Sequence, residues 1–164
     1  MTLSFAGFSD AGGAYTQDMN LRFACQPGCT KCCNVQGYVY ITEENLRQMA
    51  KYTGLPVKTF ERKYVVRFRH VLRLRKPRNS QCHFLTEEGC SVHPVKPVQC
   101  RLYPFWPELV EERANWEKER KVCPGIGKGE LIQIGAACET AAEMKTAYPT
   151  IYPDRAAQKE GLKL

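Results

Sequence analysis

Four cysteines fall within nine residues, in the segment Cys25-Gln-Pro-Gly-Cys29-Thr-Lys-Cys32-Cys33. A free cysteine often packs as a small hydrophobe, but hydrophobes are not normally set on a turn that contains proline and glycine. The turn at 26–28 is expected to fold the backbone back, so that Cys25, Cys29 and Cys32 point toward one centre. In a reducing compartment, such clustering indicates metal binding or catalysis rather than cross-linking.

The adjacent pair Cys32-Cys33 needs a separate explanation, because neighbouring side chains diverge in most backbone conformations. One of the two is expected to face elsewhere, as part of a second site, as a spare thiol or as a redox partner. Cys138 stands in an apolar helical run and is interpreted as structural. The other cysteines stand singly downstream, at Cys82, Cys90, Cys100 and Cys123.

Three chemistries fit these thiols. Zinc takes four tetrahedral ligands, usually from two paired knuckles, and only the first cluster has knuckle-like spacing. Iron–sulfur clusters accept irregular spacing, often with a remote cysteine before a proline, as at Cys123-Pro124. Cys29 and Cys32 also have the spacing of a dithiol redox site, although no thioredoxin-like pattern surrounds them. The pattern favours iron–sulfur over zinc, and either metal over none.

Histidines are the other candidate ligands. His83 and His93 each lie close in sequence to a cysteine of the set, whereas His70 does not. The sequence leaves open whether these imidazoles ligate metal or only surround the site.

The composition is that of an ordinary globular protein of 164 residues, 43% hydrophobic and 25% charged. The N-terminus has no basic stretch followed by an apolar one, and no run approaches the roughly 18 apolar residues of a membrane span. We therefore expect a cytoplasmic protein without a membrane partner, in which thiols stay reduced.

The formal charge of +7 counts every cysteine as neutral. Metal-bound cysteines are thiolates, so two four-thiolate sites would cancel roughly half of the excess. The most basic stretch, residues 62–78, alternates charged and apolar residues like a strand with one charged face. We expect a solvated edge strand, with an acidic partner or RNA as the alternative occupant of that face.

The elements that must position the cysteines are short. Residues 35–41 have strand composition, Thr42 is expected to cap a helix that Gly54 ends, and a second helix follows Pro56. The other expected elements are a hairpin over 82–90 with one cysteine on each strand, a short helix with Cys100 and Arg101, a charged helix over 108–121, a glycine-rich loop over 123–129 and a helix over 136–147.

Beyond the first cluster, further motifs follow in order: Cys82 with Phe84-Leu85, Cys90-Ser-Val, Pro97 with Cys100-Arg101, Tyr103-Pro104-Phe105 and Cys123-Pro-Gly-Ile-Gly-Lys-Gly129. With these motifs, residues 21–129 resemble the YkgJ-like cysteine-cluster family, a zinc- or iron-chelating domain. The resemblance implies a metal or iron–sulfur protein. Its metal-ligand set maps onto Cys25, Cys29, Cys32, Cys33, Cys82, Cys90, Cys100 and Cys123.

The expected fold is α+β, a small irregular single domain of short helices and hairpins around a cysteine-lined metal centre. Its expected division is a flexible N-terminal arm over 1–20, the cysteine-cluster domain over 21–129, and a C-terminal helix and tail over 130–164.

Three functions compete, and the sequence leaves open whether the chain is an enzyme. The first is an iron–sulfur protein with a redox or electron-transfer role, in which an aromatic segment at 103–106 excludes water and Arg101 offsets the cluster's negative charge. The second is a zinc-stabilised protein- or RNA-binding module. The third is a protein side-chain modifying enzyme, by analogy with the related flagellin lysine methylase.

Overall fold

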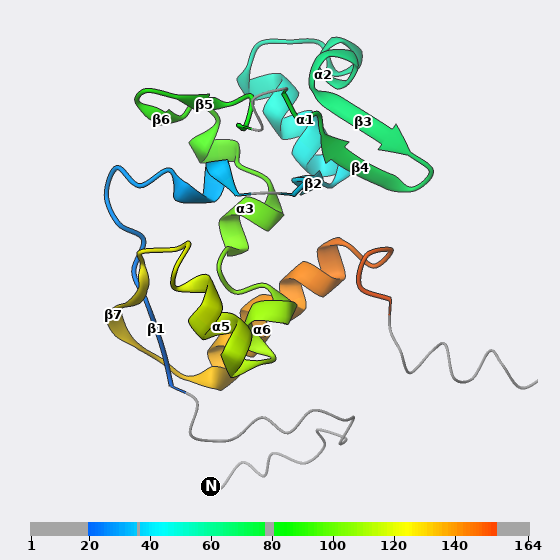
Figure 1. Cartoon of the computed structure of the whole chain (residues 1–164). Helices are drawn as coiled ribbons and strands as arrows, with labels where there is room; N and C mark the ends of the chain where they lie inside the picture. The colour runs from blue at the N-terminus through cyan, green and yellow to red at the C-terminus, as the bar shows by residue number, and fades with distance from the viewer. Residues whose placement is uncertain (1–19, 36, 78–80, 154–164) are drawn as a thin grey trace, which may run out of the picture.

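Two lobes joined by a short helix make up the computed structural model, which describes residues 20–35, 37–77 and 81–153 (Figure 1). The helices are α1 (Glu43–Tyr52), α2 (Val57–Tyr64), α3 (Val98–Leu102), α4 (Pro107–Val110), α5 (Arg113–Glu119) and α6 (Ile134–Ala147), with short 3-10 turns η1 (Lys31–Asn34) and η2 (His93–Val95). The strands are β1 (Leu21–Phe23), β2 (Tyr40–Ile41), β3 (Val65–Phe68), β4 (Val71–Leu74), β5 (Leu85–Thr86), β6 (Gly89–Cys90) and β7 (Ile126–Ile132). Helices and small antiparallel sheets confirm the α+β class.

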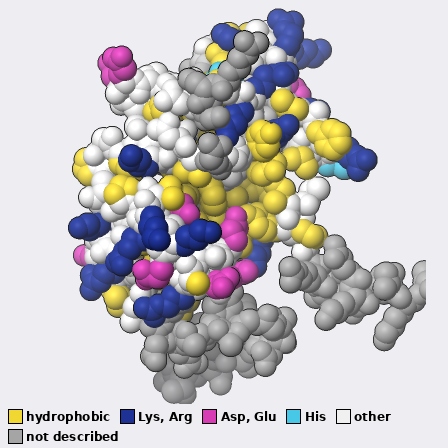
Figure 2. All heavy atoms as spheres, viewed as in Figure 1, with side chains coloured by type: hydrophobic (Ala, Val, Ile, Leu, Met, Phe, Trp, Pro, Cys, Tyr) yellow, Lys and Arg dark blue, Asp and Glu magenta, His cyan; other side chains and the backbone are white. Residues whose placement is uncertain are grey.

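We call β2 to β6 with α1 and α2 the hairpin lobe, and β1, β7, α4, α5 and α6 the helix lobe. Each lobe has its own hydrophobic core, and α3 runs between them (Figure 1). Figure 2 shows hydrophobic side chains gathered between the lobes on one face, whereas charges of both signs cover the helix lobe. No helix within the described ranges is both long and apolar enough to cross a membrane.

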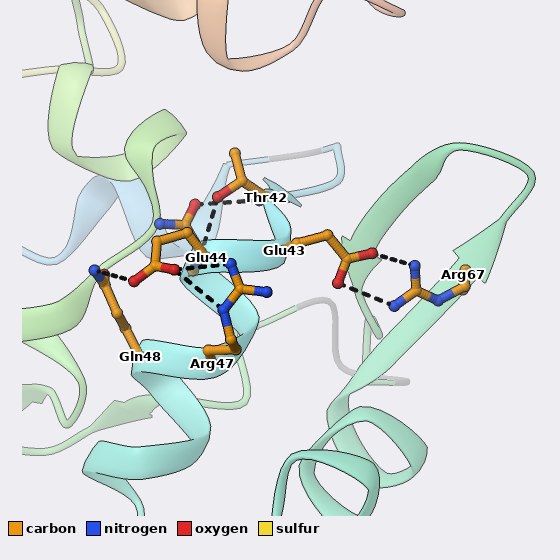
Figure 3. Close-up of polar contacts among 7 residues, drawn as sticks. Thr42, Glu43, Glu44, Arg47, Gln48 and Arg67 are labelled. Carbon is orange, nitrogen blue, oxygen red and sulfur yellow. Dashed lines mark hydrogen bonds and ion pairs between the residues drawn. The ribbon is translucent and has the colours of Figure 1, made fainter.

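The predicted start of α1 is confirmed, and it forms a reciprocal cap. The Asn45 amide donates to the Thr42 hydroxyl at 3.1 Å, and the Thr42 amide donates to Asn45 Oδ1 at 3.2 Å (Figure 3). These bonds satisfy backbone donors that a helix start leaves without partners. Gly54 ends the helix region with φ +70°, and Pro56 opens α2 as expected.

The sheet of the hairpin lobe has the strand order β2-β4-β3, all antiparallel. The expected strand over 35–41 is reduced to Tyr40–Ile41. Within the basic stretch, residues 65–74 form the β3–β4 hairpin, and β3 lies at the sheet edge as predicted. Helix α2 packs Phe60 onto Phe84, with stacked rings 5.9 Å apart, so the segment that carries Cys82 is held on this core.

The glycine-rich segment after Cys123 is a strand rather than the expected loop. Residues 126–132 form β7, which pairs with β1 and places Ile132 opposite Leu21. Gly129, at φ +76°, lies so close to β1 that an added Cβ would stand 2.7 Å from the Ala24 Cβ. Glycine at this position permits close pairing of two backbones. A glycine-rich composition is compatible with either a loop or such a strand, so the sequence did not distinguish between them.

The expected helix over 108–121 is divided into α4 and α5. Glu112 is extended, with φ −136° and ψ 118°, and Asn115 bonds across the break to the Glu108 carbonyl at 2.9 Å. The break turns Trp116 into the core, where it is 3% exposed and packs 5.6 Å from the Phe105 ring. Tertiary burial of the indole therefore overrides the helical composition.

Helix α6 confirms the predicted C-terminal helix and begins two residues earlier, at Ile134. At its end Tyr148 donates to the Tyr40 carbonyl at 2.9 Å, and it packs on Leu102 of α3. The helix lobe is therefore tied to β2 of the hairpin lobe. The predicted arm over 1–20, apart from Asn20, and residues 154–164 of the predicted tail lie outside the described residues.

Candidate metal centre

Seven of the eight predicted ligands line one pocket of about 640 Å³ between the lobes. They come from the first cluster, from the region of the β5–β6 hairpin and from α3, and all are free thiols. The seven are Cys25, Cys29, Cys32, Cys33, Cys82, Cys90 and Cys100. Cys123 does not line this pocket, and Cys138 lies apart on α6.

The turn at 26–28 positions the first cluster. The Cys29 amide donates to the Gln26 carbonyl at 3.1 Å, and Gly28 takes φ +70°. The Cys33 amide then donates to the Thr30 carbonyl at 3.0 Å, which starts η1. Both bonds reverse the chain, so residues eight apart in sequence reach the same pocket.

The β5–β6 hairpin brings the next two thiols. The Cys82 amide donates to the Cys33 carbonyl at 3.3 Å, and the strand register pairs Cys90 with Leu85. The prediction of one cysteine on each strand holds for Cys90 only, since Cys82 precedes β5.

Gln99 fixes α3, and with it Cys100, against the hairpin lobe. Its side chain accepts from the Tyr40 amide at 2.6 Å and donates to the Tyr38 carbonyl at 3.2 Å. Its own carbonyl accepts from Trp106 Nε1 at 2.9 Å. Gln99 is 7% exposed, so all these partners are needed to satisfy it. In the sequence, nothing but its position next to Cys100 distinguishes Gln99 from other glutamines.

The thiols influence one another's protonation. A hydrogen bond with the Cys33 thiol, assisted by the charge of Lys96, lowers the pKa of Cys32 to about 6. The same hydrogen bond, followed by burial, raises the pKa of Cys33. Burial, with the charges of Cys82, Cys32 and Cys90, raises the pKa of Cys100 to about 12. These thiols cannot all ionise together without a counter-charge, which a thiophilic cation would provide.

Cys123 lies next to the pocket, in the core of the helix lobe. Burial is the main cause that raises its pKa, and the charge of Cys29 adds to it. The Tyr103 phenol donates to Glu119 Oε1 at 2.5 Å, and the Tyr103 ring packs against the core that contains Cys123. Cys123 therefore lies within electrostatic range of Cys29, and a tyrosine–glutamate pair stands beside Cys123.

Positive charge on the pocket wall comes from unexpected residues. Arg75, Lys76 and Lys96 line the pocket, whereas Arg101 pairs with Glu143 on α6. Arg101 was expected to offset the cluster's negative charge, but it does not line the pocket: α3 presents Cys100 to the pocket and Arg101 to Glu143 of α6, as residues adjacent on a helix diverge.

The histidines differ in position. His93 lines the pocket, with Nε2 3.3 Å from the Lys96 Nζ. His83 instead packs its ring edge-on to Tyr64, with centroids 5.7 Å apart. His70 lies in the turn between β3 and β4.

The charge of the basic stretch is partly neutralised within the molecule. Arg67 pairs with Glu43 (Figure 3) and with Glu61. The Arg73 guanidinium lies 3.7 Å from the Tyr38 ring centroid. Phe68 remains 66% exposed at the hairpin tip. A partner on this face stays a prediction.

Residues 24–124 match the sequence profile of the CxxCxxCC family, described as a putative zinc- or iron-chelating domain. The chain belongs to this family. The match confirms the resemblance and supports metal binding. In this CxxCxxCC domain three residues, not two, separate the first two cysteines, and the added length lies in the turn that ends at Gly28. No solved structure matches the chain.

The donor set fits the metals named for the family, because thiolates bind zinc and iron–sulfur clusters. As the side chains stand, no trio of Cys, His, Asp or Glu in residues 20–35, 37–77 and 81–153 is arranged to hold a metal ion. Seven of the thiols nevertheless line the same pocket.

Proposed function

We propose that this chain is an iron–sulfur protein with a redox or electron-transfer role. The observation that carries the proposal is the convergence of seven cysteines from the first cluster, the β5–β6 region and α3 on one pocket. Irregularly spaced cysteines meeting in this way are typical of cluster binding, whereas structural zinc sites are usually built from paired knuckles. The proposed ligands are the predicted set, from Cys25 to Cys123.

A bound iron–sulfur cluster would supply one-electron transfer, and the residues around the pocket would tune it. Tyr103 and Trp106 line the wall and pack edge-on, with centroids 5.1 Å apart, so they exclude water from that side. Lys96 favours the ionised form of Cys32. The cations Arg75 and Lys96 on the wall offset thiolate charge and favour an acidic redox partner.

The test is anaerobic purification followed by measurement of iron, zinc, acid-labile sulfide and the visible spectrum. We expect brown protein in which sulfide matches iron. Cys100→Ser should reduce both, whereas Cys138→Ser on α6 should leave both unchanged. Colourless protein with stoichiometric zinc and no sulfide would overturn the proposal.

That zinc outcome would favour the second candidate, a zinc-stabilised protein- or RNA-binding module. The exposed Phe68 ring beside the positive Arg69 is the specific feature that favours it, with the guanidinium 5.4 Å from the ring centroid. An aromatic ring next to an arginine can stack on an RNA base. Salt-sensitive RNA binding that Phe68→Ala weakens would support this candidate.

A further inference from the structure

A second, smaller pocket of about 260 Å³ lies in the helix lobe, between β1, α5 and the first residues of β7. It shares no lining residue with the pocket of the cysteines. Its lining includes three arginines from separate places in the fold: Arg22 of β1, Arg113 at the start of α5 and Arg120 just after α5. Figure 1 shows α5 beside β1 and β7, so residues far apart in sequence meet at this pocket.

Two of the three guanidinium groups are held by the backbone around them. Arg22 donates from Nη1 to the Gly129 carbonyl at 2.8 Å. The Arg120 guanidinium lies over Gly127, where its Nη2 occupies the space that an added Cβ would take. Gly127, at φ +85°, therefore leaves room for this side chain. These donors stay at the pocket without a ligand, which lowers the cost of ordering them when a ligand binds.

The arginines carry more positive charge than their neighbours neutralise. Among the described residues that line the pocket, Glu117 alone is acidic, and its Oε2 lies 3.3 Å from Arg120 Nη1. Arg22 bonds to a carbonyl, which has no net charge. Arg113 has no acidic partner in the part of the chain that the structure describes. Two positive charges are therefore left over at a concave surface.

Trp116 gives the pocket a packed wall. It is 3% exposed and belongs to the core of the helix lobe, where its ring packs on Phe105. Its indole N–H has no hydrogen-bond partner within residues 20–35, 37–77 and 81–153, and no buried side-chain donor in these residues lacks one. The N–H is therefore accessible to solvent, and it adds a neutral donor to a residue that lines the pocket.

We infer that this pocket binds a phosphate group, present as the free anion or carried by a small phosphomonoester. A phosphate carries a charge of roughly −1.5 to −2 at pH 7, which matches the two positive charges left over. The planar arginine fork donates to two phosphate oxygens at once, so arginine suits such a site better than lysine does. A carboxylate has one charge and two oxygens, and it would leave one of these arginines without a partner.

The inference does not depend on the proposed function, because no residue of this pocket is a proposed metal ligand. Its test is isothermal titration calorimetry on the full chain, purified with its metal, in a buffer without phosphate at pH 8 and constant ionic strength. The two probes are methyl phosphate and inorganic phosphate. The variants are Arg113→Ala, Arg22→Ala and Glu117→Gln. Arg47→Ala is the matched control, because Arg47 is an exposed arginine of α1 that pairs with Glu44, and its loss lowers the net charge equally.

We expect the wild type to bind methyl phosphate with a Kd of about 1 mM or tighter. Arg113→Ala and Arg22→Ala should each weaken binding by about tenfold or more, because each removes charge-assisted hydrogen bonds to the anion. Glu117→Gln should tighten binding, since it removes the carboxylate that competes for Arg120, and a misfolded variant cannot produce such a gain. Arg47→Ala should stay within about twofold of the wild type, because salt screens a charge so far from the pocket.

The two probes identify the source of the phosphate group. Tighter binding of methyl phosphate assigns the pocket to a phosphomonoester, whereas tighter binding of inorganic phosphate assigns it to the free anion. The inference would be wrong if neither probe bound saturably, or if Arg113→Ala bound both probes as the wild type does. It would also be wrong if Arg47→Ala weakened binding as much as Arg113→Ala, because net charge alone would then attract the anion.

Discussion

The phenol of Tyr103 donates a 2.5 Å hydrogen bond to the Glu119 carboxylate and also contacts the Cys123 thiol. Burial first, and then the Glu119 bond, raise the pKa of Tyr103, so the phenol stays a neutral donor at physiological pH. This pair links the aromatic segment to the helix that leads into Cys123.

Tyr103→Phe removes the donor and keeps the ring. We expect the free energy of unfolding to fall by about 1–2 kcal/mol, because a half-buried bond to a charged acceptor is lost. Urea denaturation under reducing, anaerobic conditions measures it. The control is Tyr52→Phe, whose ring is 51% exposed on α1 and which should change stability little. Equal stability of both variants would mean that the Glu119 bond contributes nothing.

Gln99→Leu should destabilise the chain by about 1–3 kcal/mol, since the Tyr40 amide loses its acceptor inside the protein. It should also lower metal content, because Gln99 fixes α3 and Cys100 follows it directly. Metal analysis beside urea denaturation tests both effects. Gln48→Leu is the matched control, as Gln48 is exposed and its side chain bonds to Glu44 of its own helix. Full metal content in folded Gln99→Leu would contradict the positioning role.

The Glu43–Arg67 pair predicts a small acid sensitivity. The hydrogen bond from the Arg67 guanidinium to the Glu43 carboxylate is the main cause that lowers the pKa of Glu43 (Figure 3). A carboxyl whose folded pKa is depressed adds stability above its unfolded pKa, and that stability is lost as the pH falls through the folded pKa.

Glu43→Gln should therefore cost about 0.2–1 kcal/mol at pH 7 and nothing at a pH below both pKa values, because the pair is largely exposed. Denaturant midpoints compared at both pH values measure this, and raised salt should shrink the pH 7 difference. A difference that persists unchanged at the lowest pH would assign the effect to something other than the charge.

Metal removal should destabilise the chain more than any of these substitutions. With the metal stripped by a chelator, the thiols no longer join the two lobes, and we expect the melting temperature to fall by roughly 10 °C or more. Differential scanning calorimetry of loaded and stripped protein tests this. Re-addition of metal, and of sulfide and reductant for a cluster, should restore the transition. An unchanged melting temperature would show that the lobes hold together without metal.

The sequence predicted those structural features that depend on residues a few positions apart. The Thr42 cap depends on a side chain three residues away, and the turn before Cys29 depends on Pro27 and Gly28. The eight cysteines could be selected because no packing requirement explains their density. The family match over 24–124 follows from the same residues.

Tertiary contacts decided the rest. Composition predicted a loop over 123–129 and one helix over 108–121. Pairing with β1 made residues 126–129 part of a strand, and burial of Trp116 divided the helix. Arg101 faces α6, and Gln99 holds α3, through partners more than forty residues away. The sequence alone determined which residues are the candidate metal ligands, because cysteines clustered on a turn with proline and glycine are rarely explained by packing. The way in which the two separately packed cores meet decides which thiols and which cationic side chains face the pocket. The free energy that holds the cores together comes from contacts between residues far apart in sequence, which no local pattern encodes.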